Sequence, residues 1–209
     1  MDPAVERENC VEMHRSLKEC GLILPYRVLD GREFFKLSES MGPPRMASEM
    51  EALNHYFERE WVYLVNGGWK RPTGYHMLRS GFHQIMPFDF AEYNECGPEA
   101  DSMVISLQRF SEISGGYFIP ENSTCSIIDH FYILEFDWRT KRHSLSLPAT
   151  PDFMPLDELQ EQLNSLLIEA GSTRLYWNVV PQWPTEEGGT IFAMDESLRI
   201  ATDRGLLAR

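Results

Sequence analysis

Three acidic residues of one predicted β-strand carry side chains that could do chemistry together. Residues 125–138 alternate between two faces, and Asp129, Glu135 and Asp137 fall on the same face. Two carboxylates on one face can supply the acid and the base of glycoside hydrolysis. Because apolar residues separate these acids, the face also has the character of a surface that binds a basic protein. We expect partner binding, with ordinary strand-end acids around a core as the alternative.

A second group of residues could hold a metal ion or transfer protons. His76 and His83 are seven positions apart, and Asp89 follows them. Neutral imidazole and carboxylate are ligands of zinc and iron, but this spacing matches no common metal motif such as HExxH. Asp129 and His130 are neighbours, so in a strand their side chains point to opposite faces and cannot act as one pair. Packed structural histidines are the favoured interpretation.

Other catalytic and cofactor signatures are missing from the sequence. It contains no GxxxxGK[ST] phosphate loop, no GxGxxG after a predicted strand and no GxSxG nucleophile motif. Its four cysteines are far apart and form no CxxC pair, which predicts buried thiols rather than structural zinc. We therefore expect no cofactor, no metal and no enzymatic activity.

A segment near the C-terminus has the composition of a binding loop. Trp183 stands between two prolines, and Glu186 and Glu187 follow it. An exposed tryptophan can anchor a protein interface, and the two acids would favour a basic partner. Burial of Trp183 in the core is the commoner alternative.

The elements that must position these residues alternate between helices and strands without a regular βαβ order. Apolar spacing and capping residues predict helices over 3–20, 48–66, 101–113 and 156–170. Alternation and turn residues predict strands over 22–29, 32–37, 125–138, 143–147, 174–180, 190–194 and 198–202. Residues 69–98 are aromatic and poorly periodic. The prediction is an α+β fold with mostly antiparallel sheet, three to four amphipathic helices and one domain over residues 1–209.

Charge limits the class of partner. The 209 residues contain 19 Lys and Arg against 32 Asp and Glu, a net charge of −13. Nucleic acids and anionic membranes need positive potential on the protein, so we expect neither as a ligand and expect a basic protein instead. The N-terminus lacks the pattern of a secretory signal and no apolar run approaches 18 residues, which predicts a cytoplasmic protein.

Three functions fit this pattern to different degrees. The favoured hypothesis is an acidic inhibitor, most simply a bacterial immunity protein that neutralises a basic toxin or effector by stoichiometric binding. The alternatives are an enzyme centred on His76, His83 and Asp89, and a phage-type inhibitor that mimics DNA. Assembly as a homodimer is an open alternative to a monomer.

Overall fold

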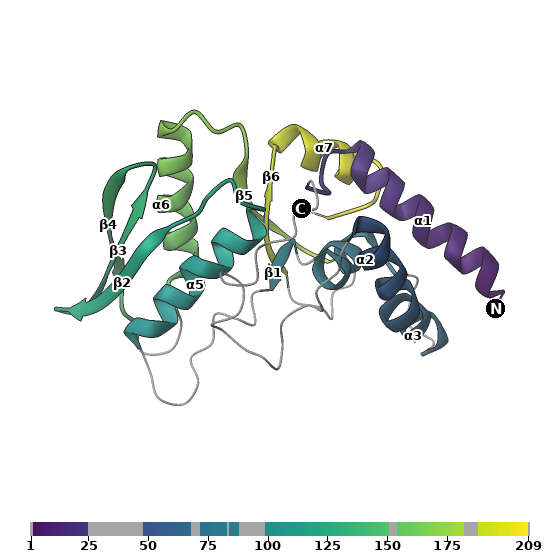
Figure 1. Ribbon diagram of the computed structural model, residues 1–209, viewed down its shortest axis with the longest axis horizontal. Helices are drawn as coiled ribbons and strands as arrows, with labels where there is room; N and C mark the ends of the chain where they lie inside the picture. Colours follow the sequence, from purple (N-terminus) through teal and green to yellow (C-terminus); the bar gives the residue numbers. More distant parts are fainter. Residues whose placement is uncertain are drawn as a thin grey trace. The chain divides into compact units, whose positions relative to one another are not determined.

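The computed structural model describes residues 2–24, 48–67, 72–82, 84–87, 99–150, 154–181 and 188–208. The fold is α+β with antiparallel pairing, as the sequence predicts (Figure 1). The chain divides into two compact units: unit 1 comprises residues 1–87 and 177–209, and unit 2 comprises residues 88–176. Within the described ranges, none of the helices has both the length and the apolarity needed to cross a bilayer. The expected single domain over 1–209 stays a prediction.

Unit 1 is mainly helical. Its elements are α1 (Pro3–Glu19), α2 (Glu49–Tyr56), the π-helix η1 (Phe57–Trp61), α3 (Val62–Asn66), α4 (Gly74–His76), the π-helix η2 (Met77–Gly81), β1 (Ile85–Pro87), β6 (Gly189–Ala193) and α7 (Asp195–Asp203). Strand β6 pairs with β1 in antiparallel register and is the middle strand of the order β1-β6-β5. Strand β5 (Leu175–Val179) contains the boundary between the two units.

The helix boundaries of unit 1 follow from the capping residues. The side chain of Asp2 accepts a hydrogen bond from the Ala4 N–H, and that of Ser48 accepts one from the Glu51 N–H. Gly21 lies just beyond α1 with a φ of +72°, a left-handed conformation that glycine adopts without strain. The expected starts of both helices are therefore confirmed.

The core of unit 1 lies between α1, the α2–η1–α3 helix and β6. Trp61, Tyr56 and Tyr75 are its large buried aromatic residues. The Trp61 indole N–H donates to the Glu6 carboxylate at 3.1 Å, so its one polar atom is satisfied. Gly74 has no space for a side chain, because a Cβ there would lie 2.4 Å from the Leu206 carbonyl oxygen.

Unit 2 is a three-stranded antiparallel sheet with helices on one face. Its elements are α5 (Ala100–Ile113), β2 (Glu121–Ile128), β3 (Phe131–Trp138), β4 (Lys141–Pro148) and α6 (Leu156–Glu169), and the strand order is β2-β3-β4. Helix α5 packs on β2 and β3, and α6 packs on β4. The helix-facing side chains of β3 are the buried ones: Tyr132, Leu134, Phe136 and Trp138. The opposite face of the sheet is called the open face below.

The predicted strand over 125–138 is wrong, because the chain turns within it. Asp129 and His130 have φ values of 48° and 65° and connect β2 to β3 as a two-residue hairpin turn. The two residues that flank such a turn pair with each other, so Ile128 and Phe131 share a face. The sequence conceals this turn because the turn contains neither Gly nor Pro, although Asp and His both adopt the left-handed conformation more often than most residues do.

A second correction concerns residues 198–202, which form part of helix α7 rather than a strand. Asp195 and Glu196 occupy the first turn of α7, where negative charge is stabilised by the helix dipole. Leu198 and Ala201 are buried three positions apart, which is a helical period. The predicted strands over 22–29 and 32–37 lie largely or entirely outside the described residues.

Candidate partner-binding surface

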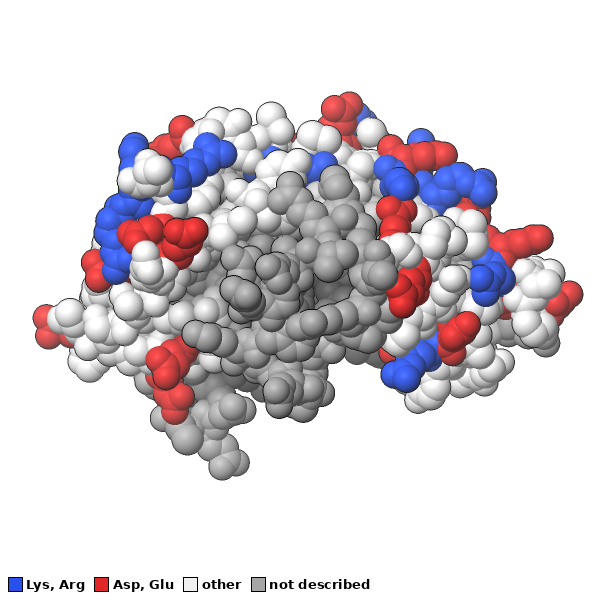
Figure 2. Space-filling model, in the orientation of Figure 1, with Lys and Arg blue, Asp and Glu red and all other residues white. Residues whose placement is uncertain are grey.

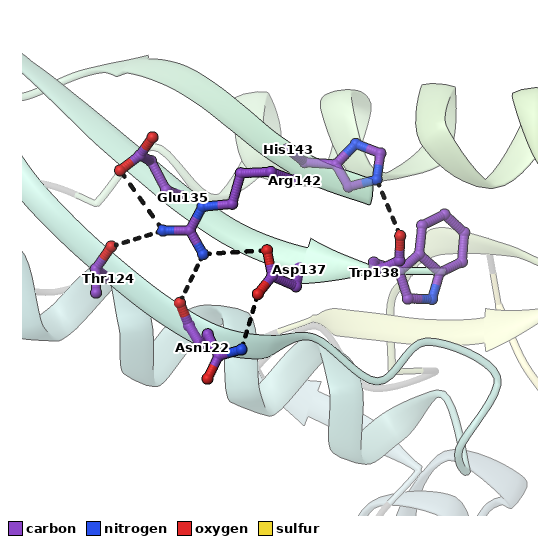
Figure 3. A network of polar contacts seen from close by, with 7 residues as sticks. All are labelled: Asn122, Thr124, Glu135, Asp137, Trp138, Arg142 and His143. Atoms are coloured by element: carbon purple, nitrogen blue, oxygen red, sulfur yellow. Dashed lines mark hydrogen bonds and ion pairs between the residues drawn. The ribbon is translucent and has the colours of Figure 1, made fainter. Parts of the chain in front are cut away.

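A polar network crosses all three strands on the open face of unit 2 (Figure 3). The Arg142 guanidinium of β4 donates to the Asn122 carbonyl of β2 at 2.9 Å and to the Asp137 carboxylate of β3 at 3.3 Å. It also lies 3.6 Å from the Glu135 carboxylate. The Asn122 amide donates to Asp137 at 2.8 Å, and Asn122 has a φ of 49° within the bulge of β2. The network therefore fixes the bulge against the other two strands.

Arg142 changes the charge of the face that the sequence predicts to be acidic. The hydrogen bond from Asn122, followed by the Arg142 guanidinium, lowers the pKa of the Asp137 carboxyl. Glu135 and Asp137 both lie beside the same cation. Partly exposed pairs of this kind add little stability, but they cancel local negative potential. The open face is consequently of mixed charge.

The structure separates the six residues expected to bind a partner. Glu135 and Asp137 share the open face, as expected. Asp129 does not join them, because it is exposed in the β2–β3 turn. The other three, Trp183, Glu186 and Glu187, lie outside the described residues.

The hairpin end of the open face is apolar. Ile128 is 55% exposed and Phe131 is 46% exposed, although both are large hydrophobic side chains. They are paired across β2 and β3, so they form one continuous contact area beside the exposed Asp129. Exposed apolar area next to carboxylates is typical of protein-binding surfaces.

The acidity of the chain is concentrated in unit 2. This unit contains 15 Asp and Glu against 5 Lys and Arg, a net charge of −10. Unit 1 contains 17 Asp and Glu against 14 Lys and Arg, a net charge of −3. Three of the five cations of unit 2 (Arg139, Lys141 and Arg142) surround the β3–β4 turn. In Figure 2 basic side chains gather at the upper left, whereas acidic ones stand without basic neighbours at the far left, where β2 ends.

Helix α6 is a second acidic part of unit 2. Four acids of this helix are exposed, and the helix contains no Lys or Arg. They are Asp157, Glu158, Glu161 and Glu169. Asp157 and Glu158 stabilise the helix start, whereas Glu169 lies at the unfavourable C-terminal end of the dipole. Glu169 therefore has no benefit for the helix itself.

No protein-family model, curated protein or solved structure matches the chain. Its function must therefore be inferred from the chemistry of its own surfaces and buried groups.

Of the three residues expected in the alternative enzyme site, the structure describes only His76. His76 is buried, and its Nδ1 accepts a hydrogen bond from the Thr73 N–H at 3.2 Å. The Thr73 hydroxyl is also 2.8 Å from this nitrogen, so the pair caps α4. His83 and Asp89 lie outside the described residues. Among the residues that the structure describes, no three His, Cys, Asp or Glu side chains are grouped to hold a metal.

The described cysteines are poorly suited to nucleophilic chemistry. Burial raises the pKa of the Cys10 thiol to about 12, and burial likewise raises that of Cys125 to about 11. Burial also raises the pKa of Cys20. Since the thiolate is the reactive form, these three thiols are unreactive near neutral pH.

A buried histidine of unit 1 is absent from the residues that the sequence singles out. His14 is 7% exposed and stacks on Phe82 with ring centroids 5.3 Å apart. Its Nε2 lies 3.0 Å from Glu49, which also binds Lys18 at 2.7 Å. Burial lowers the pKa of His14, although the Glu49 carboxylate opposes this shift. His14 lies on the same helix stripe as Cys10 and Leu17, so its position is a signal of burial that the sequence contains.

This histidine predicts a loss of stability in acid. A histidine whose pKa is lower in the folded state binds protons more readily when the protein is unfolded. The free energy of unfolding is therefore unaffected by protonation of His14 above pH 6.5 and decreases as the pH falls below that value. We expect His14→Phe, which keeps the stacking on Phe82, to flatten the pH dependence of unit 1 between pH 7 and 5. Hydrogen exchange of α1 amides across this range measures it. His55→Gln on α2 is the control, and equal flattening in both variants would contradict the assignment.

Proposed function

We propose that this protein binds a basic partner protein stoichiometrically and inhibits it, as a bacterial immunity protein does with its toxin. The observation that supports the proposal most directly is the net charge of −10 on unit 2. A field of this size captures cationic proteins rapidly and resists like-charged ones. A cytoplasmic location is part of the proposal and suits the free thiols of Cys10, Cys20 and Cys125.

The binding surface proposed here differs from the acidic stripe that the sequence predicts. Arg142 cancels much of the potential of Glu135 and Asp137, so these residues contribute less to attraction than their charges suggest. Other exposed acids of unit 2 lie at the hairpin end of the sheet and on α6. Exposed Ile128 and Phe131 add apolar area at the first of these places.

Affinity capture from the native host tests the proposal. The tagged full-length protein should retain one basic protein at near-equal stoichiometry at low salt, and release it as the salt concentration rises. Mass spectrometry identifies the captured protein, and an activity assay of that protein then shows inhibition at a molar ratio of one. Capture of acidic or neutral proteins only, or capture that does not respond to salt, would contradict a basic partner.

A further inference from the structure

The two edges of the unit 2 sheet differ in how well they are protected. Strands β2 and β4 are these edges, since the strand order is β2-β3-β4 (Figure 1). The Gln162 side chain of α6 donates to the Ser146 carbonyl of β4 at 3.0 Å. Pro148 removes one donor from this edge, and Lys141 and Arg142 place charges along it. These are the usual devices by which proteins block an edge against a further strand.

Within the part of the chain that the structure describes, strand β2 lacks these devices over Thr124–Ile128. From Asn122 to Ile128 it contains no charged residue and no proline, and three of its residues are β-branched. Most of its residues are exposed, and Ile127 is 42% exposed. The bulge between Glu121 and Thr124 interrupts regular pairing, which leaves Thr124–Ile128 as a regular edge of five residues.

The register shows which backbone groups of β2 point away from the sheet. Ile128 and Phe131 flank the two-residue turn and exchange both of their backbone hydrogen bonds. From there along the strands, hydrogen-bonded pairs alternate with non-hydrogen-bonded pairs. Ser126 and Thr124 therefore direct their backbone groups to β3, whereas Cys125 and Ile127 direct theirs outward. The same alternation points Ser146 outward on β4, in agreement with the hydrogen bond from Gln162.

The described surroundings of this edge carry more acidic than basic groups, with the Arg142 guanidinium, 3.4 Å from the Thr124 hydroxyl on the open face, as a basic one. Glu121 precedes the regular segment and Asp129 follows it, and both are exposed. Asp101, in the first turn of α5, is also exposed and is close enough to interact electrostatically with Cys125. Neither β2 nor α5 up to Gln108 contains a Lys or Arg. A strand that adds here with cationic side chains would meet complementary charge at both ends and along α5.

We propose that β2 is the docking strand for the partner, which adds an extended basic segment to the sheet along Thr124–Ile128. The inference rests on the proposed function, because it takes the partner to be basic. The outward N–H and C=O groups of Cys125 and Ile127 supply the main-chain hydrogen bonds, and Ile127 and Ile128 supply apolar contacts to alternate side chains. Binding of this kind places the partner segment beside β2 as a fourth strand.

A synthetic peptide pair tests the docking strand in the full-length protein. The probe is an acetylated and amidated nine-residue peptide that alternates Lys with Val and Thr. The control peptide has the same charge but carries proline at the uncharged positions, so it cannot pair as a strand. At low salt we expect the probe to bind at least about tenfold more tightly than the control peptide, and to protect the Cys125 and Ile127 amides from hydrogen exchange.

Three variants separate strand addition from simple charge attraction. Ile127→Pro removes an outward N–H without removing a bond to β3, and we expect it to weaken probe binding at least about tenfold. Ile127→Val keeps the N–H and an apolar β-branched side chain, so it should weaken probe binding much less than Ile127→Pro, by less than about threefold. Ser144→Pro makes the same change at an outward position of β4 and should leave probe binding unchanged.

Each other outcome overturns the docking strand in a distinguishable way. Equal binding of the two peptides, or equal binding by Ile127→Pro and Ser144→Pro, would show attraction by charge alone. The proposal of a basic partner would be unaffected by that result. Concentration-dependent dimerisation that Ile127→Pro abolishes would assign β2 to a second copy of this chain. If neither peptide binds, the proposed basic partner fails together with the docking strand.

Discussion

Association with the captured partner should slow about tenfold when the acids around β2 are removed. The variant combines Asp101→Asn, Glu121→Lys and Asp129→Asn, which raises the net charge by four. Asparagine keeps the left-handed turn at position 129, and the lysine introduced at position 121 would face Asp137 across the strands, so the fold should be retained. Stopped-flow or surface-bound kinetics near physiological salt measures the association rate, because distant charges are then screened.

A variant of α6 with the same change in charge is the control. Glu161→Lys with Glu169→Lys also raises the net charge by four, but α6 packs on β4 at the opposite edge of the sheet from β2. We expect this variant to slow association less than about threefold. A larger effect from α6 than from the β2 variant would move the contact to the helix. The proposal of a basic partner would then be retained, and the proposal that β2 is the docking strand would be rejected.

The parts of the fold that the sequence predicts well are those with a single physical signal. Ser48 caps a helix whose apolar residues keep one period as far as Asn66, and the structure confirms this helix, with a π-helical turn inside it. Helices α5 and α6 are confirmed for the same reason. Strand β3 is confirmed over Phe131–Trp138, where alternation matches burial of every second residue.

The errors arise where two periods fit the same residues. Leu198–Thr202 alternates like a strand, but Leu198 and Ala201 also match a helical stripe, and the core of unit 1 selects the helix. At Asp129 the alternation continues through a turn, because a two-residue hairpin inserts only two positions. Propensity alone does not resolve either case, since tertiary packing decides it.

The candidate surface is only half predictable, because a pattern of charges does not reveal their partners. The alternation places Glu135 and Asp137 on one face correctly. Their neutralisation by Arg142 depends on the β3–β4 register, in which Asp137 faces Arg142. That register follows from a two-residue turn at 139–140. The sequence predicts a longer turn over 139–141 and a strand that begins only at His143, so Arg142 is not placed opposite Asp137. The concentration of charge in unit 2 could be counted only after the structure had given the bounds of the two units.

Phe136→Ala is expected to lower the free energy of unfolding of unit 2 by about 3–5 kcal/mol. Phe136 is fully buried and contacts Phe118 edge-to-face with ring centroids 5.7 Å apart. It also stacks on His143 at 5.5 Å, so truncation leaves a cavity bounded by two rigid rings. Urea unfolding followed by circular dichroism measures the loss, and hydrogen exchange of β3 peptides assigns it to unit 2.

Phe131→Ala removes the same side chain from the same strand, but on the open face, where Phe131 is 46% exposed. Its cost should be below about 1 kcal/mol, because little buried contact is lost. Comparable losses in the two variants would mean that the hairpin end of the open face is covered in solution, and that Ile128 and Phe131 are unavailable to a partner.

The Phe136→Ala variant also tests the number of domains. An equal loss of hydrogen-exchange protection in α1 would show that both units unfold as one domain, as the sequence predicts. A loss confined to β3 and its neighbours would make unit 2 a domain of its own, and the acidity of the chain would then belong to one domain.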